Sequence, residues 1–236
     1  MHVPDGFIDA PVSLAAGAVA VGGLAVCLRG ARREMDERTA PLAGLVAAFV
    51  FAVQMLNFPV AVGTSGHLIG GALAAILVGP WTGAVCVAVV LMVQAVLFAD
   101  GGLTALDVNV VLLAFVSVAA GYAIFKSLVL VLPKRSGSVV AAAAVSAGCS
   151  VPLAALGFVG VYAAGGTTAV PLDAVTAAMV GVHLLIGVGE GVITGLTVAS
   201  VLAVRPDLVR GARHLVHKSA LTGRPTAGLA LDSSRR

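Results

Sequence analysis

Met1 and His2 could bind one metal ion together, because a histidine at position two has donors that an internal histidine lacks. The free α-amine and the His2 backbone nitrogen close a five-membered chelate ring, and that backbone nitrogen and His2 Nδ1 close a six-membered one. Once the amide loses its proton, the three nitrogens lie in a plane that a fourth would complete as a square. Square-planar nitrogen sites suit Ni(II) or Cu(II), and low-spin Co(II) is a further candidate. The alternative is that a histidine occupies this position by accident.

His67 is the candidate for the fourth nitrogen. It lies in the segment Gly63-Thr64-Ser65-Gly66-His67-Leu68, where a short apolar helix is predicted to begin, on the side where we expect the N-terminus. Neutral imidazole is the commonest nitrogen ligand of metals, and His214 and His217 belong to a polar tail on the other side. An interfacial histidine with no further role is the alternative; the neighbouring glycines and His2 favour a metal site.

Ionisable and amide side chains also occur inside or beside apolar segments. His183 and Glu190 are seven residues apart, about two helical turns, so they share one face of a helix. Such residues are costly in a membrane and by default indicate function. Hydrogen bonds to a neighbouring helix, a hydrated cavity, or support for binding or transport would each account for them. The candidates for supporting a metal site are Asn57, Ser65, Asn109, His183 and Glu190, with Gln54 and Gln94 as further polar candidates.

Composition places these residues in a membrane protein. The chain has 236 residues, of which 59% are hydrophobic and only 11% charged, and its mean hydropathy is +1.07. A soluble domain carries about 25% charged residues. We therefore expect an integral membrane protein without a large soluble domain.

Seven apolar runs predict an all-α, polytopic bundle of about seven transmembrane helices. The stretch from 67 to 98 is too long for one span of about 20 residues, and Gly79-Pro80 inside it predicts a break. The first half is short, so its helix should begin below the membrane surface. The runs are 11–28, 41–58, 67–79, 81–98, 108–132, 138–165 and 173–204. We expect one transmembrane metal-binding domain, 1–204, with an N-terminal strap, 1–10, and a cytoplasmic basic tail, 205–236.

The basic residues predict the orientation. With seven spans, all 14 lysines and arginines fall on one side, while the other side carries aspartates such as Asp5, Asp100 and Asp173. Cytoplasmic loops are enriched in basic residues, so the N-terminus is expected outside and the C-terminus in the cytoplasm. The positive net charge of the chain therefore does not indicate a nucleic-acid partner. The basic residues are Arg29, Arg32, Arg33, Arg38, Lys126, Lys134, Arg135, Arg205, Arg210, Arg213, Lys218, Arg224, Arg235 and Arg236.

Several smaller features complete the expectations. Glycines four apart, at 66 and 70 and at 187, 191 and 195, predict close helix packing inside the bundle, with a groove for a partner helix as the alternative. Asp100-Gly101-Gly102 predicts an outer turn, and Asp107 the cap of the next helix; a metal role for these aspartates is weaker. Residues 208–215 could form a short interfacial helix, and the chain beyond 221 should be disordered.

The sequence lacks the motifs of several functions. There is no G-x-x-x-x-G-K-[ST] phosphate loop, so ATP hydrolysis by that route is not expected, and no H-E-x-x-H, so a zinc protease of that type is not expected. Cys27, Cys86 and Cys149 are isolated in apolar runs without a C-x-x-C pair, which indicates packing rather than a disulfide or thiolate metal site.

Four segments together resemble the CbiM/NikM family, the substrate-specific membrane components of energy-coupling-factor transporters for cobalt and nickel. Two are Met1-His2-Val3-Pro4-Asp5-Gly6-Phe7 and Gly63-Thr64-Ser65-Gly66-His67-Leu68. The others are Phe98-Ala99-Asp100-Gly101-Gly102-Leu103-Thr104-Ala105-Leu106 and the stretch from His183 to Gly195 with Glu190. They span most of the chain, to Arg205-Pro206-Asp207-Leu208, and the combination is specific.

The resemblance implies a transported metal bound by the Met1 amine, the His2 backbone nitrogen and imidazole, and the His67 imidazole. It also implies a location in the plasma membrane of a prokaryote and three kinds of partner: a transmembrane coupling subunit, cytoplasmic ATPases and a small membrane accessory subunit. Whether the accessory subunit is a separate chain is left open. The missing phosphate loop fits this arrangement, because the separate ATPases would hydrolyse the ATP. No fused accessory domain is expected, because no further pair of spans follows Arg205.

Our interpretation is a substrate-capture subunit, not an enzyme, that takes Co(II) or Ni(II) from outside and passes it inward when ATP-driven partners act. It holds no prosthetic group. The alternative is a metal channel or secondary carrier that works alone. An intramembrane enzyme using His183 and Glu190, and a structural subunit without substrate, are the remaining rivals. Cobalt versus nickel is left open.

Overall fold

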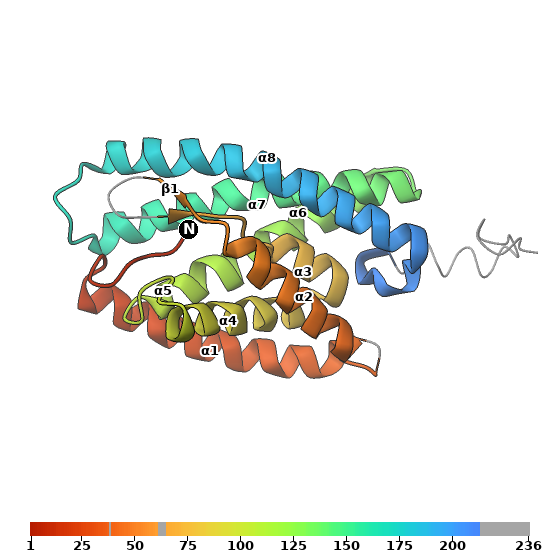
Figure 1. The fold of residues 1–236 in the computed structure, drawn as a ribbon, viewed down its shortest axis with the longest axis horizontal. Helices are drawn as coiled ribbons and strands as arrows, with labels where there is room; N and C mark the ends of the chain where they lie inside the picture. The colour runs from red at the N-terminus through yellow and green to blue at the C-terminus, as the bar shows by residue number, and fades with distance from the viewer. Residues whose placement is uncertain (38, 61–64, 213–236) are drawn as a thin grey trace, which may run out of the picture.

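The computed structural model describes residues 1–37, 39–60 and 65–212, and they form a helical bundle with a two-stranded ribbon at one end (Figure 1). The helices are α1 (Ala10–Glu34), α2 (Thr39–Gln54), α3 (Gly71–Val78), α4 (Pro80–Leu97), α5 (Leu106–Asn109), η1 (Val110–Val116), α6 (Ser117–Val131), α7 (Ser136–Gly165) and α8 (Leu172–Val204). The antiparallel ribbon consists of β1 (Phe58–Pro59) and β2 (Ser65–Gly66).

Each predicted apolar run contains a helical segment. The π-helix η1 joins α5 to α6, so Leu106–Val131 is one continuous span. In the described residues five helices are long and apolar enough to cross a membrane: α1, α4, Leu106–Val131, α7 and α8. The protein is therefore a multi-pass membrane protein. α2, with 16 residues, and α3, with 8, are shorter, and the seven-span count stays a prediction.

The short helix α3 lies at the centre of the bundle, and all its residues are buried. It begins at Gly71, so the prediction that the helix starts at His67 is wrong by four residues. The chain before it is extended, and Gly70 turns it into the helix with a φ of +76°, a conformation that suits glycine. At the other end Gly79 (φ +104°) and Pro80 separate α3 from α4, which confirms the predicted break.

Glycines allow α7 and α8 to pack closely, as predicted. A Cβ atom on Gly187 would lie 2.5 Å from the Gly148 carbonyl oxygen, and one on Gly191 would lie 2.8 Å from the Ala144 oxygen. Gly66 and Gly70 do not form such a helix pair, because both lie in the extended segment before α3. Gly66 instead makes room for the Ile186 and Val60 side chains.

Two further local predictions are wrong. Asp107 does not cap the helix: the N-cap is Ala105, because the turn between Gly102 and Ala105 starts the helix earlier. In place of a helix from 208, the chain forms two 3-10 turns, η2 (Pro206–Leu208) and η3 (Arg210–Ala212). They are held against the bundle, since Arg210 donates to the Glu34 carbonyl oxygen (3.0 Å). The predicted disorder beyond 221 lies outside the described residues.

The two ends of the bundle differ in the charged residues that lie beside the helix termini. α1, α6 and α8 end, and α7 begins, at the same end of the bundle, and the strap lies toward the opposite end (Figure 1). The former end is where the described basic residues of the sequence lie, beside these helix termini. By the positive-inside rule this is the expected cytoplasmic end, and the orientation stays a prediction.

This charge distribution generates a topology prediction. A reporter that is active only in the cytoplasm should work when fused after Arg236 and should be inactive when fused within the connection between α7 and α8. Activity measured in whole cells distinguishes the two sites. An inactive C-terminal fusion beside an active one between α7 and α8 would reverse the orientation.

Candidate metal centre

The N-terminal strap is threaded into the end of the bundle. Met1 and Val3 are fully buried and His2 is 4% exposed. The Val3 N–H donates to Asn109 Oδ1 (2.8 Å), and the Val3 carbonyl accepts from Asn109 Nδ2 (3.2 Å) and from the Gly102 N–H (3.0 Å). A buried main chain needs such partners, so Asn109 and the outer turn fix the strap beside its first residues.

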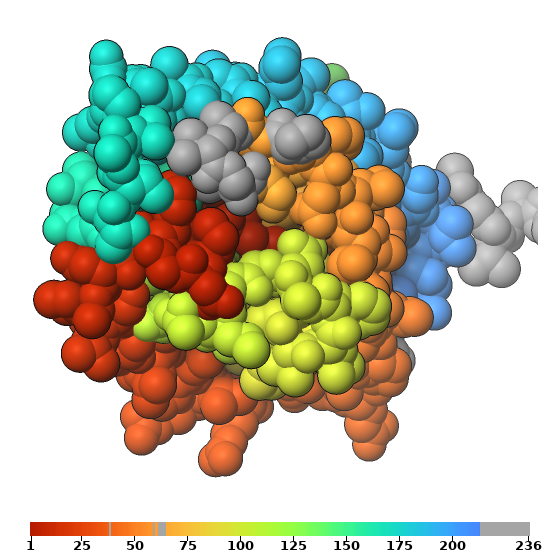
Figure 2. All heavy atoms as spheres, turned by 60° about the vertical axis from the view of Figure 1, so that its left-hand side comes forward, coloured from red at the N-terminus to blue at the C-terminus, as the bar shows by residue number. Residues whose placement is uncertain are grey.

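The remainder of the strap is fastened on both sides (Figure 2). Asp5 Oδ1 accepts from the N–H (2.7 Å) and hydroxyl (2.6 Å) of Thr104 in the connection between α4 and α5. Asp9 donates its N–H to the Gly165 carbonyl (2.7 Å) at the end of α7, and Phe7 packs on Tyr162. The strap thus ties α1 to the α4–α5 and α7–α8 connections.

The structure brings Met1, His2 and His67 together. The imidazole rings of His2 and His67 lie 4.3 Å apart, centroid to centroid, and His2 pairs with Ser65 in an isolated β-bridge. His67 is fully buried, and its Nδ1 lies 2.7 Å from the Leu68 carbonyl oxygen. Because a carbonyl only accepts, Nδ1 carries the proton and Nε2 keeps its lone pair. That Nε2 has no hydrogen-bond partner among the described residues.

Asp100 holds the His2 ring. Its Oδ1 lies 3.1 Å from His2 Nδ1, and its Oδ2 accepts from Asn57 Nδ2 (2.9 Å). Burial raises the pKa of Asp100, but the hydrogen bonds from His2 and Asn57 outweigh it, so the pKa lies below its ordinary value. The carboxylate is therefore ionised at neutral pH. A chelate through Nδ1 requires the ring to turn away from Asp100.

Burial also prepares the terminal amine as a donor. It lowers the pKa of the Met1 amine well below its ordinary value, despite the nearby Asp100 and Glu190 carboxylates. Burial likewise lowers the pKa of His2, against the hydrogen bond that the ring donates to the Asp100 carboxylate. Desolvation disfavours the charged forms, so burial favours the neutral form of both groups. Neutral nitrogens are the form that binds a metal.

Glu190 and Gln54 hold the segment that carries His67. The Glu190 carboxylate is buried and accepts from the Ile69 N–H (2.6 Å) and the Gly70 N–H (2.9 Å). Gln54 Nε2 donates to the Ile69 carbonyl (2.7 Å). Hydrogen bonds to a charged acceptor are the stronger kind. Of the alternatives for Glu190, hydrogen bonding to a neighbouring element is the one the geometry supports.

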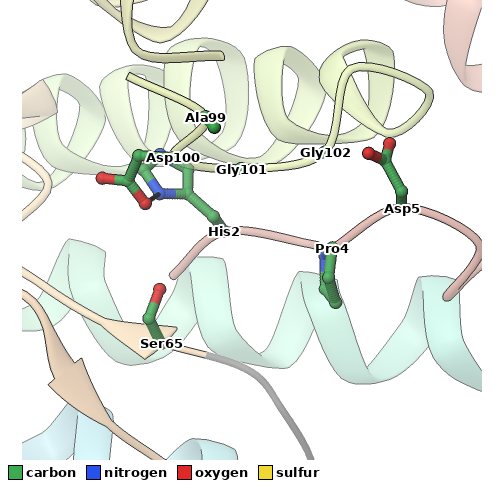
Figure 3. A pocket seen from close by; sticks show the side chains of 8 residues that line it. All are labelled: His2, Pro4, Asp5, Ser65, Ala99, Asp100, Gly101 and Gly102. Atoms are coloured by element: carbon green, nitrogen blue, oxygen red, sulfur yellow. Dashed lines mark hydrogen bonds and ion pairs between the residues drawn. The ribbon is translucent and has the colours of Figure 1, made fainter.

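A cavity of about 300 Å³ adjoins His2 (Figure 3). In the figure the His2 ring lies against Asp100, and Pro4 and Asp5 continue along the strap. The cavity is lined by His2, Pro4, Asp5, Ser65, Ala99, Asp100, Gly101 and Gly102. Among the described residues no three histidine, cysteine or carboxylate side chains converge on one point. A metal site here would need donors besides these side chains, and the Met1 amine and main-chain nitrogens are the proposed ones.

Of the predicted site residues, Met1, His2, His67, Asn109 and Ser65 meet at this place, with Glu190 behind the His67 segment. Asn57 reaches it only through Asp100. Asp100 was expected mainly to form the outer turn, and its hold on His2 was missed. The sequence held one relevant signal, the two glycines that follow Asp100. In the structure Gly101 has a positive φ and leaves room for the His2 ring.

Comparison with known proteins identifies the family to which this fold belongs. Residues 2–208 match the CbiM family, described as the cobalt uptake substrate-specific transmembrane region. The chain belongs to this family. CbiM proteins are transporter components rather than enzymes, and the described structure adds nothing that indicates catalysis.

Relatives of the CbiM-family chain transport metals according to their names. The cobalt transport protein CbiM of Sorangium cellulosum is 34% identical, over 89% of this chain and 94% of the relative. A protein of Archaeoglobus fulgidus assigned as the fused nickel transport protein NikMN is 40% identical, over 89% of this chain and 68% of the relative. A crystal structure of a transition metal transporter has a TM-score of 0.80 at 30% identity, covering 95% of this chain and all (100%) of that one.

The Glu190 hydrogen bonds generate a stability prediction. In Glu190→Gln the amide oxygen can accept from one of the two main-chain N–H groups, but the amide NH₂ faces the other and leaves it unsatisfied. An unsatisfied buried donor costs about 1–3 kcal/mol, so thermal unfolding in detergent should shift to lower temperature. Asp173→Asn, at an exposed position of α8, is the matched control and should leave the midpoint unchanged. Equal midpoints for both variants would contradict the role of Glu190.

Proposed function

We propose that this chain is the substrate-capture membrane subunit of an ATP-driven transporter of the energy-coupling-factor type that imports Co(II) or Ni(II). The observation that carries the proposal is the meeting of a buried free amine with His2 and His67 at one end of a CbiM-family bundle. The Met1 amine, the His2 main-chain nitrogen and His2 Nδ1 bind the ion as a planar chelate. His67 Nε2 is the fourth nitrogen.

The orientation and the partners follow from the same proposal. The strap faces the outside and the basic tail the cytoplasm, so the ion enters from the cavity beside His2. The chain carries no phosphate loop, and a transmembrane coupling subunit with cytoplasmic ATPases supplies the energy. A small membrane accessory subunit is the further partner that the family resemblance implies.

The second candidate function is a channel or secondary carrier that works alone. ATP-independent uptake by the reconstituted chain would favour it. The choice between cobalt and nickel needs elemental analysis of the purified protein and a competition between the two ions, since affinity of nitrogen sites follows a general order that does not by itself set selectivity. The names of the relatives divide between the two metals.

Adding one residue before Met1 tests the chelate. The added residue turns the amine into an amide and removes the five-membered ring, while the His2 side chain stays intact. Loss of a chelating donor should weaken Co(II) or Ni(II) binding by at least about 100-fold, as His2→Ala and His67→Ala should, measured by calorimetry on purified protein. One residue added after Arg236 is the control. Met1 is fully buried, so the fold has to accommodate the added residue. A thermal midpoint near that of the parent is therefore required to show that the extended protein is folded. Parent-like affinity in the extended protein would disprove the terminal chelate.

The chelate also predicts a pH dependence. The amide nitrogen binds the metal only without its proton, so each pH unit downward should weaken binding about tenfold. Burial lowers the pKa values of the Met1 amine and His2, so the competition of protons for these two nitrogens is shifted to lower pH. Metal titrations between pH 8 and pH 6 measure the slope. An affinity that does not change over this range would speak against the amide ligand.

A further inference from the structure

His183 carries a buried ring nitrogen that the metal site does not use. The residue lies on α8 and is fully buried. Its Nδ1 lies 2.7 Å from the Met179 carbonyl oxygen, one helical turn earlier. Since the carbonyl only accepts, Nδ1 holds the proton and Nε2 holds a lone pair. This Nε2 has no hydrogen-bond partner in the part of the chain that the structure describes.

His67 shows the same arrangement. In both residues a main-chain carbonyl fixes the tautomer through Nδ1, and Nε2 is left with a free lone pair in a buried place. A metal-binding histidine almost always donates its other ring N–H to a carbonyl, a carboxylate or a water, which fixes the tautomer and orients the ring. His183 therefore has the surroundings of a ligand, although the four proposed nitrogens do not include it.

The position of His183 places it next to the segment that carries His67. An ideal Cβ on Gly66 would lie 3.7 Å from His183 Cε1, so the ring packs on the residue that precedes His67. The Met1 amine is within electrostatic reach of both imidazoles, and His67 is within reach of His183. Two helical turns further along α8, Glu190 holds the same segment by the N–H groups of Ile69 and Gly70.

We propose that His183 Nε2 is an additional nitrogen ligand for the transported ion, one that shares the ion with His67 while the Met1 and His2 nitrogens bind or leave. The proposal rests on the proposed function. A planar chelate releases its ion slowly unless another donor takes up each vacated position. As the strap nitrogens leave, the His2 amide nitrogen takes a proton from a water molecule, which departs as hydroxide, and His183 Nε2 fills one of the vacated positions.

The first test separates transport from equilibrium binding. His183→Leu keeps an apolar side chain of similar size in the helix and removes the lone pair. In cells that carry the complete transporter, uptake of radioactive Co(II) should fall by about tenfold or more, while the purified chain should bind Co(II) within about threefold of the parent, because its four ligands are intact. Leu185→Ile, at an exposed position of the same helix, is the control. Parent-like uptake by His183→Leu would overturn the proposal, and so would an equal loss of binding and uptake.

The second test uses protein without the strap chelate and does not depend on transport. His2→Ala should retain weak Co(II) binding through His67 and His183, and the double variant His2→Ala/His183→Leu should bind about tenfold more weakly still. Titration by visible absorption of Co(II) measures both. His183→Asn in place of Leu guards against misfolding, since its Nδ2 takes the place of Nδ1 and can still donate to the Met179 carbonyl. Equal affinities of the single and double variants would overturn the role of His183. A His2→Ala protein that binds as tightly as the parent would instead contradict the proposed function.

Discussion

The burial of the chain's own N-terminus is the constraint on which the rest of this structure depends. An ammonium group is expensive to remove from water, so burial of Met1 lowers the pKa of its amine and favours the neutral form. The strap behind it also has to satisfy its main-chain groups, and it does so through Asn109 and the main chain of Gly102 and Gly165. The termini of most proteins are poorly ordered, whereas here the N-terminus is ordered and presents a set of nitrogen donors.

The same requirement explains the unusual third segment. In a helix starting at His67, the N–H groups of the first turn would have no partner within the helix, and the later N–H groups would be used inside it. Instead the segment before α3 stays non-helical. Ser65 pairs with His2 and Gly66 with Phe58, and two N–H groups further along donate to the Glu190 carboxylate. α3 then begins at Gly71 in the middle of the bundle. A buried acid on α8 thus fixes a histidine that is more than a hundred residues away in sequence, and both belong to the region that meets the strap.

Sequence reasoning predicted the elements whose cause is local. Apolar runs predicted each helical segment, Gly79 and Pro80 the break after α3, and the glycines of α8 its contact with α7. The approach of Met1, His2 and His67 was predicted from chelate chemistry and family resemblance. Asp100 on His2 and Glu190 on Ile69 and Gly70 were not predicted as pairs, because such contacts depend on how distant segments pack. The cap at Ala105 and the 3-10 turns after Arg205 were missed because turns and docking contacts, rather than residue preferences, set those boundaries.

The central claim is that the amine, a main-chain nitrogen and two imidazoles form one planar site. X-ray absorption at the metal edge of the purified, Co(II)- or Ni(II)-loaded protein tests it most directly. We predict a four-coordinate planar spectrum with nitrogen ligands only and the outer-shell scattering of imidazole rings. A six-coordinate spectrum dominated by oxygen ligands would contradict the claim.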